Sequence, residues 1–174
     1  MIDESAAEYH GLRATIRERG TLRICLVIVG LIAMSALIVA LRAARLSGVI
    51  ALLPFLVLAA TFEINFFVHT GVERIGRYLQ VFYEERAGTT GWETTAMNYG
   101  AKYPSGLDPL FSALFAAAAT LNFLTTLAVA REPGWIALSL AAHLTFAYRI
   151  VSARALASSQ RALDLERFRA LLSK

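Results

Sequence analysis

Long runs of apolar residues alternate with short polar stretches along the chain. The first run, 24–41, holds no charged residue. A helix of roughly 20 apolar residues crosses the ~30 Å of hydrocarbon in a bilayer. A buried helix of a soluble protein usually keeps one polar stripe toward water, and 24–41 has no such stripe. The sequence therefore predicts an all-α integral membrane protein whose four transmembrane helices, paired as two hairpins, lie at 23–41, 49–68, 110–130 and 135–151.

Two of these spans run on into charged sequence without a helix break. After the second span, Ile75, Leu79 and Phe82 recur on one side of a helix. We expect this helix to continue into the cytoplasm to about Glu85. The fourth span is expected to continue in the same way to about residue 173, because its apolar positions keep a helical period.

The remaining segments carry different signals. Residues 87–106 are predicted to be irregular, since they contain four Gly, several Thr and one Pro. Asp108 and Pro109 suit the start of the third span, as N-cap and first-turn proline. Residues 3–19 are compatible with an amphipathic helix at the membrane surface or with a partly ordered tail.

These elements divide the chain into three regions. An amphipathic cytoplasmic segment occupies 1–21, and a C-terminal cytoplasmic helix occupies 153–174. The four-helix transmembrane domain lies between them at 22–152 and includes a cytoplasmic loop at 71–106.

Basic residues are concentrated on one side of this topology. Of the 17 Lys and Arg residues, the two short connections between spans hold only Arg42, Arg45 and Arg131. Because cytoplasmic loops carry the excess of Lys and Arg, we expect a multi-pass protein with both termini in the cytoplasm. Arg outnumbers Lys by 15 to 2 and Ala is abundant, as in GC-rich bacteria, so the predicted location is the bacterial cytoplasmic (inner) membrane. The first span reads as an uncleaved anchor, because an acidic segment precedes it.

Glu63 is an ionisable residue inside the second predicted span. A charge in hydrocarbon costs several kcal/mol unless it is paired or hydrated. Tyr148 and Arg149 lie at a similar depth from the inner end of the fourth span. We expect one of them to bind the Glu63 carboxylate and so to join the two hairpins. The alternative is a proton or cation site at Glu63.

His143 lies near the middle of the fourth span. A neutral imidazole there is expected to hydrogen-bond to Asn122, or to a Thr of the third span. Ligand binding or proton relay is the alternative role for His143.

Charged residues follow the second span at helical spacing. His69, Glu73 and Arg77 succeed one another at four-residue intervals, and Arg74 shares the side of Glu63. No Glu-x-x-His motif accompanies them, and the Walker A, dinucleotide-binding, HExxH, GxSxG and CxxC motifs are absent from the sequence. We therefore assign no catalytic, cofactor-binding or metal-binding residue. The mixture of acidic and basic side chains argues against nucleic-acid binding.

Three classes of function remain open. The favoured one is a non-enzymatic membrane subunit, scaffold or effector that acts through its cytoplasmic loop and C-terminal helix. The second is a small oligomeric channel or transporter in which Glu63, Asn122 and His143 line a path. The third is an inner-leaflet enzyme that uses His69, Glu73 and Arg77.

The expected partners follow from the same features. They are the lipid bilayer, anionic lipids attracted to the basic face, and a second copy or a membrane-protein complex. Small residues recur every four positions in the third and fourth spans. Such spacing lets helix backbones approach closely in lipid, either between subunits or within one chain.

Overall fold

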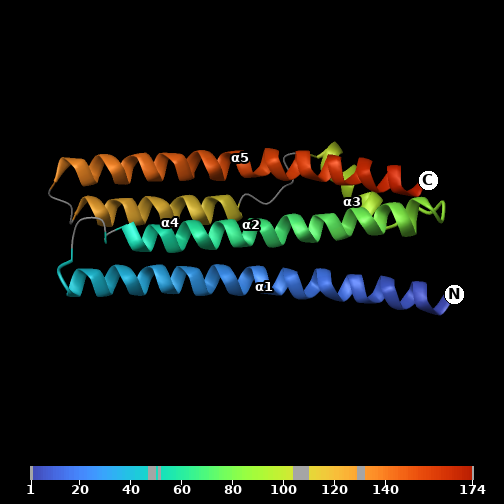
Figure 1. Ribbon diagram of the computed structural model, residues 1–174, viewed down its shortest axis with the longest axis horizontal. Coiled ribbons are helices and arrows are strands. Elements are labelled where there is room, and N and C mark those ends of the chain that lie inside the picture. Colours follow the sequence, from blue (N-terminus) through green and yellow to red (C-terminus); the bar gives the residue numbers. More distant parts are fainter. Residues whose placement is uncertain (1, 47–49, 51, 104–109, 129–131, 174) are drawn as a thin grey trace. The chain divides into compact units, whose positions relative to one another are not determined.

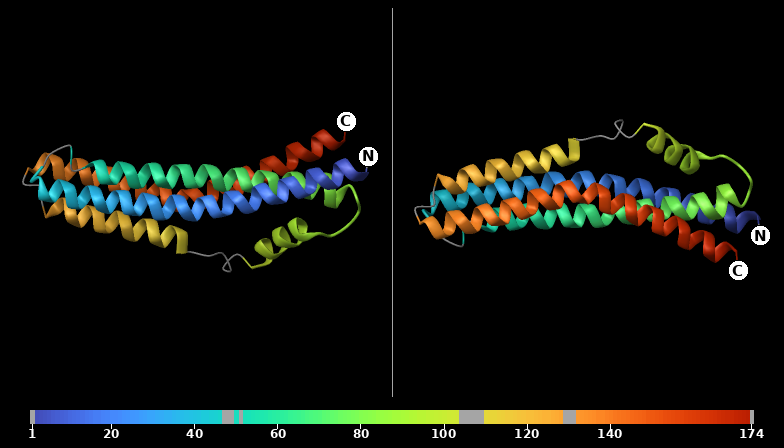
Figure 2. Two further views of the ribbon diagram at one scale, coloured as in Figure 1. Left: turned by 90° about the horizontal axis from the view of Figure 1, so that it is seen from below. Right: turned by 90° about the horizontal axis from the view of Figure 1, so that it is seen from above.

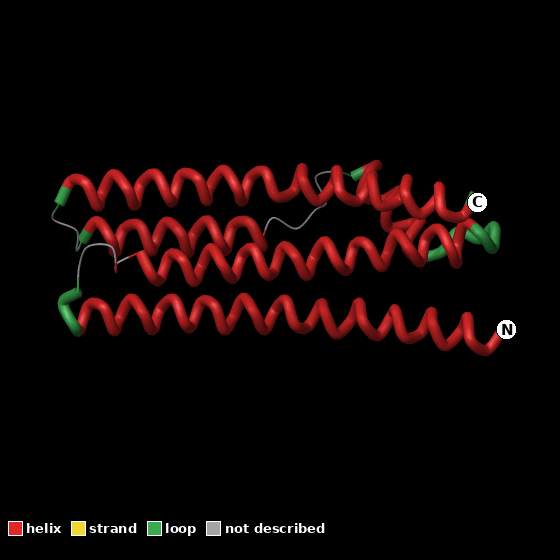
Figure 3. Tube along the Cα trace, in the orientation of Figure 1, coloured by secondary structure: helices red, strands yellow, loops and turns green. Residues whose placement is uncertain are grey.

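The computed structural model describes residues 2–46, 50, 52–103, 110–128 and 132–173. The described residues form helices, and no strand occurs among them (Figures 1 and 3). In chain order the elements are α1 (Ile2–Ala43), α2 (Leu53–Leu79), the π-helical turn η2 (Gln80–Glu85), α3 (Trp92–Lys102), α4 (Leu110–Leu127) and α5 (Pro133–Leu172). The predicted all-α class is confirmed.

Both predicted helical extensions are present. Helix α2 passes directly into η2, which ends at Glu85, and α5 continues to Leu172 (Figure 2). At the N-terminus, the helical alternative is correct, because α1 begins at Ile2 and reaches Ala43 without interruption.

The prediction of an irregular segment at 87–106 is wrong for its central part, which forms α3. Gly91 lies just before this helix as its N-cap, with φ −97° and ψ −165°. Glu93 in the first turn and Lys102 in the last turn both complement the helix dipole. The glycines and threonines therefore mark the boundaries of a short helix rather than a long loop. The proposed helix start at Asp108 and Pro109 lies outside the described residues.

Three helices are long and apolar enough to cross a membrane by length and composition. They cover Ser5–Ala43, Leu53–Glu85 and Pro133–Leu172. Helix α4, with 18 residues, is shorter. At 1.5 Å per residue it extends about 27 Å, slightly less than the ~30 Å hydrocarbon core. The fourth span therefore remains a prediction.

The chain divides into two compact units. We call Ile24–Phe66 with Pro109–Arg154 the apolar unit, and Met1–Arg23, Phe67–Asp108 and Ala155–Lys174 the charged unit. Helices α1, α2 and α5 contribute residues to both. The charged unit thus brings together the N-terminal segment, most of the predicted cytoplasmic loop and the C-terminal helix.

Aromatic rings fill the core of the apolar unit. Phe62 of α2 is 1% exposed and packs against Phe115 of α4 and Phe146 of α5, with ring centroids 5.1 and 5.4 Å away. Met34 of α1 completes the same cluster. All four helical segments of this unit therefore share one hydrophobic core.

The surface of the apolar unit differs from that of a soluble protein. Its buried polar side chains include Asn65, Asn122, Ser139 and His143, whereas large aliphatic side chains cover its surface. The exposed aliphatic residues include Ile24, Ile28, Val29, Ile32, Val39, Leu56, Ile64, Leu121, Leu124, Leu144 and Val151. Contiguous apolar surface of this extent is unfavourable in water and suits hydrocarbon.

Helices α1 and α2 approach each other closely at Gly30. A Cβ added to Gly30 would lie 2.8 Å from the Cβ of Thr61 and nearer still to the rest of that side chain. The Thr61 hydroxyl donates to the Val57 carbonyl of its own helix at 2.7 Å. Gly30 is therefore required for the packing distance.

We expect Gly30→Ala to destabilise the protein by about 1–3 kcal/mol, because it overpacks this contact. Chemical unfolding in mild detergent measures the change. Gly11→Ala is the matched control on the same helix, since an added Cβ there meets nothing within 4 Å. That control is expected to stabilise α1 by up to about 1 kcal/mol. Equal responses of the two variants would contradict the close contact.

Candidate functional site

The candidate site is a cluster of buried charged residues in the charged unit, built where α2 passes into η2. In η2 the Arg86 amide donates to the Val81 carbonyl five residues earlier, at 3.3 Å. This wider turn is characteristic of a π-helix and changes which side chains face inward. It leaves Gln80, Val81 and Glu84 buried.

Glu84 caps the N-terminus of α3. Its two carboxylate oxygens accept hydrogen bonds from the backbone amides of Glu93 and Thr94, at 2.9 and 2.8 Å. These amides are among the donors that a helix start leaves unsatisfied. Gly91 makes room for this contact, because a Cβ at that position would collide with the Glu84 carboxylate. Burial alone raises the pKa of Glu84, but the hydrogen bonds from Thr94 and Glu93 outweigh it and hold the pKa below its usual value.

Glu93 joins three helices. Its carboxylate forms ion pairs with Arg13 of α1 at 2.8 Å and with Arg77 of α2 at 3.2 Å. Gly76 permits this approach to α2, since a Cβ there would lie 2.7 Å from a Glu93 oxygen. The Arg77 side chain is only 4% exposed and also donates to the side chain of Gln80. A buried guanidinium and a buried carboxylate therefore neutralise each other at the junction.

Three ion pairs attach α5 to α2 and η2 within this unit. Their distances are 3.1 Å for Arg74–Asp164, 2.9 Å for Arg161–Glu73 and 2.6 Å for Arg169–Glu85. The last is bidentate, because two guanidinium nitrogens of Arg169 reach the two oxygens of Glu85. These pairs fix α5 at three successive levels of the charged unit.

Glu8 of α1 binds two tyrosines. Its carboxylate accepts from the hydroxyls of Tyr78 and Tyr83, at 2.8 and 2.7 Å. Burial and the hydrogen bond to Glu8 raise the pKa of Tyr78 to about 12. The Tyr78 ring also packs edge to face against the ring of Phe168 of α5, with the ring centroids 5.7 Å apart. Tyr78 thus links α1, α2 and α5.

Of the four residues singled out after the second span, three fall into this network through ion pairs. Arg74, Arg77 and Glu73 each bind a residue from another helix. Burial and the nearby Arg23 guanidinium lower the pKa of His69, in spite of Glu73. The lowered pKa favours the neutral form of His69.

In the apolar unit, the predicted partner of Glu63 is confirmed as Arg149. Arg149 Nε lies 2.8 Å from one carboxylate oxygen, and its Nη2 donates to the other at 2.9 Å. The guanidinium also lies over the ring of Phe66, 4.5 Å from the centroid. Tyr148, the other candidate, is 75% exposed. The Glu63 side chain is 49% exposed, so the pair lies at the surface of this unit.

The predicted hydrogen bond between His143 and Asn122 is also confirmed. His143 Nε2 lies 3.1 Å from the Asn122 side-chain amide, and Nδ1 donates to the Ser139 carbonyl at 2.7 Å. Each ring nitrogen therefore has an oxygen atom within 3.1 Å inside the unit. The rings of Phe55 and Phe123 pack against the imidazole at 4.3 and 5.1 Å.

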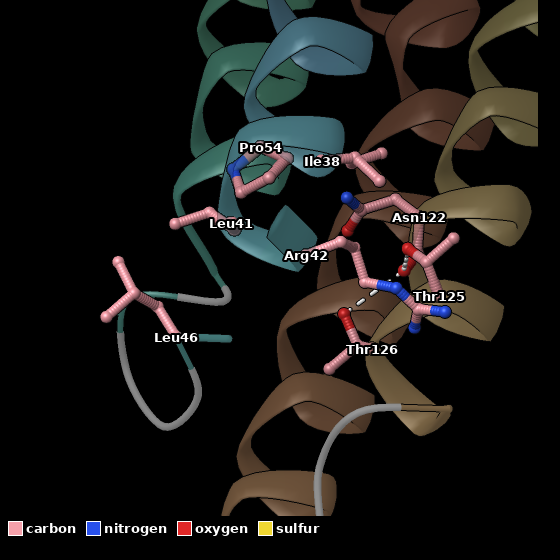
Figure 4. Close-up of a pocket in the computed structure, with 8 residues that line it drawn as sticks. All are labelled: Ile38, Leu41, Arg42, Leu46, Pro54, Asn122, Thr125 and Thr126. Carbon is pink, nitrogen blue, oxygen red and sulfur yellow. Dashed lines mark hydrogen bonds between the residues drawn. The ribbon is translucent and has the colours of Figure 1, made fainter. Parts of the chain in front are cut away.

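A small pocket opens beside Asn122 (Figure 4). The Thr125 and Thr126 hydroxyls both donate to the Asn122 carbonyl, at 2.7 and 3.1 Å. The side chain of Arg42 reaches toward these hydroxyls, and Ile38 lies beside the Asn122 side chain (Figure 4). The pocket thus combines one cation with threonine oxygens and an apolar wall.

Sequence reasoning missed Arg13, Glu84, Glu93 and Asp164, although they form the centre of the network. Glu93 follows Gly91 at the start of a stretch whose aromatic residues recur at helical spacing. Recognition of that period would have predicted α3 and an acidic first turn. The pairing of Glu93 with Arg13, 80 residues away, has no local signal.

Among the described residues, no group of three or more His, Cys, Asp or Glu side chains is arranged to hold a metal ion. No protein-family model, curated protein or solved structure matches the chain.

We expect Glu93→Gln to destabilise the charged unit by about 3–5 kcal/mol, because it leaves the buried Arg77 without its carboxylate. Chemical unfolding in mild detergent measures this loss, and hydrogen exchange of the α3 amides locates it. Glu166→Gln on α5 is the control, since Glu166 is exposed and its change is expected to stay within about 0.5 kcal/mol. Unchanged α3 exchange in Glu93→Gln would refute the anchoring role.

Proposed function

We propose that the chain is an integral membrane protein with four spans, located in a bacterial inner membrane, and that it acts as a non-enzymatic subunit, scaffold or effector. The carrying observation is the surface of the apolar unit, which consists largely of exposed aliphatic side chains, while His143 and Asn122 pair in its core. Helix α4, though short, contains no charged residue and shares the core of the three longer helices.

The proposed topology places the charged unit in the cytoplasm. Basic residues are concentrated in its segments, whereas Arg42, Arg45 and Arg131 alone belong to the two connections on the other side. This asymmetry favours a cytoplasmic N-terminus and C-terminus.

The charged unit supports a structural role rather than catalysis. Its buried ionisable side chains are Arg77, Glu84, Glu93 and Asp164, and each binds another helix. In the enzyme alternative, Arg77 and Glu73 would act on lipid headgroups, but both are held in ion pairs. Such ion pairs hold the helices of the charged unit together and so support a defined surface on that unit.

The C-terminal helix offers such a surface. Leu156, Leu163 and Leu171 of α5 are 51%, 44% and 60% exposed and recur at seven or eight residues. This spacing places them along one side of the helix. It supports contact with a second copy or with another subunit of a membrane complex.

Topology reporters test this proposal. We expect fusions at residue 1 and at residue 174 to be active only as cytoplasmic reporters, and insertions at 44–46 or at 132 to be active only outside the cytoplasm. Termini on opposite sides of the membrane would refute the four-span arrangement. Recovery of the protein as a monodisperse species in detergent-free buffer would refute membrane insertion itself.

A channel or transporter is the second candidate, and the Glu63–Arg149 pair favours it. An ion pair at the surface of an apolar unit is costly in lipid unless water or another subunit covers it. Assembly of several copies around a pore would provide that cover. Against a path through one copy, Asn122 and His143 bind each other in the core.

Flux measurements separate the two candidates. For a channel, we expect Glu63→Gln in vesicles to change ion flux while the protein keeps its size in detergent. The exposed Glu132 provides the matched variant, Glu132→Gln, which is expected to behave as wild type. A protein that is monomeric in mild detergent and carries no flux supports the scaffold proposal.

A further inference from the structure

Helix α3 has two different faces. Glu93 points into the charged unit, where Arg13 and Arg77 hold it. Roughly a quarter to a third of a turn away around the helix, Trp92, Tyr99 and Tyr103 are 69%, 59% and 47% exposed. These three aromatic residues are spaced by seven and four positions, so they follow one side of the helix. We call this side, together with Lys102, the aromatic face.

The composition of the aromatic face matches the headgroup layer of a bilayer. Trp and Tyr collect at membrane–water interfaces because their rings have an apolar body and a polar tip. The exposed side chain next to these rings, Thr95, is polar. A groove on a partner protein would be matched instead by aliphatic side chains at a helical period, which the aromatic face lacks.

The charge of this face also suits lipid. Glu93 is neutralised inside the unit by two arginines, which leaves Lys102 as the charged group on the aromatic face. Its ammonium lies 5.4 Å from the Tyr103 ring centroid, and the rings of Tyr99 and Tyr103 are 5.1 Å apart. A cation beside paired tyrosine rings is attracted to anionic headgroups.

The chain length keeps α3 near the membrane. Seven residues, 103–109, separate Lys102 from Leu110, where the third predicted span begins. A chain of this length extends at most about 25 Å. The end of α3 is therefore tethered close to the inner surface.

We propose that α3 is an interfacial helix that rests its aromatic face on the cytoplasmic headgroup layer, while Glu93 holds its other face to the charged unit. This inference rests on the proposed membrane topology. It assigns 71–106 a lipid partner, and it makes α3 the contact through which the bilayer surface is coupled to the charged network.

The two tryptophans provide the test. Trp92 lies on α3 and Trp135 at the start of α5. Trp135→Phe leaves Trp92 as the single emitter, and Trp92→Phe leaves Trp135. Each variant is reconstituted into vesicles of phosphatidylcholine and phosphatidylglycerol that carry a brominated acyl chain at a shallow or a deep position.

We expect the emission of Trp92 to shift to the blue on reconstitution and to be quenched more strongly by the shallow bromine than by the deep one. Tyr99→Ser combined with Tyr103→Ser is expected to weaken this quenching. Asn98→Ser, an exposed change on α3 about a third of a turn away from the aromatic face, is expected to leave it unchanged. Size in detergent confirms that each variant remains folded.

The outcomes distinguish this inference from the proposal on which it rests. If Trp135 is quenched but Trp92 stays solvent-like, the interfacial helix is overturned and the membrane topology survives. If neither tryptophan is quenched, membrane insertion itself fails. If Trp92 shifts to the blue without lipid quenching and only as protein concentration rises, the aromatic face binds a second copy and the lipid assignment is overturned.

Discussion

Burying Glu93 and Arg77 away from water costs several kcal/mol for each ion, and only close pairing offsets that cost. The charged unit meets this constraint with one carboxylate placed between Arg13 and Arg77. Gly76 and Gly91 allow it, because each leaves space where a carboxylate approaches a helix. The π-helical turn places the Glu84 carboxylate where it accepts hydrogen bonds from the first backbone amides of α3. Removal of the Glu93 carboxylate leaves the buried Arg77 guanidinium without its ion-pair partner.

The same constraint governs the apolar unit, where hydrocarbon in place of water would make an unpaired polar group costlier still. His143, Asn122 and Ser139 satisfy one another in the core, and Arg149 satisfies Glu63 through two contacts. Each unit therefore provides partners for the ionisable side chains described above, although one presents aliphatic residues on its surface and the other presents charges. Single helices such as α2 and α5 contribute residues to both units, and in each unit their ionisable side chains bind partners from other helices.

Sequence reasoning succeeded where the signal is periodic or where chemistry leaves few choices. The apolar period predicted the length of α5, and the cost of a charge in a span predicted the binding of Glu63 by Arg149. It failed at α3, because Gly and Thr residues at the ends of a short helix were taken as evidence of a loop. The charged residues after the second span were recognised as a group, but their partners Glu93, Asp164 and Arg161 were not.

The sequence by itself determined the helical class, the apolar segments and the residues whose charge or polarity demands a partner, because each of these depends on composition and local period. Only the tertiary structure decided which partner each residue has. Arg13 and Glu93 are 80 positions apart, and Glu63 and Arg149 are 86 apart. Contacts across such separations depend on how helices pack, on close approaches such as that of Gly30 to Thr61, and on the wider π-helical turn of η2. These are properties of three-dimensional packing that no local pattern of residues encodes.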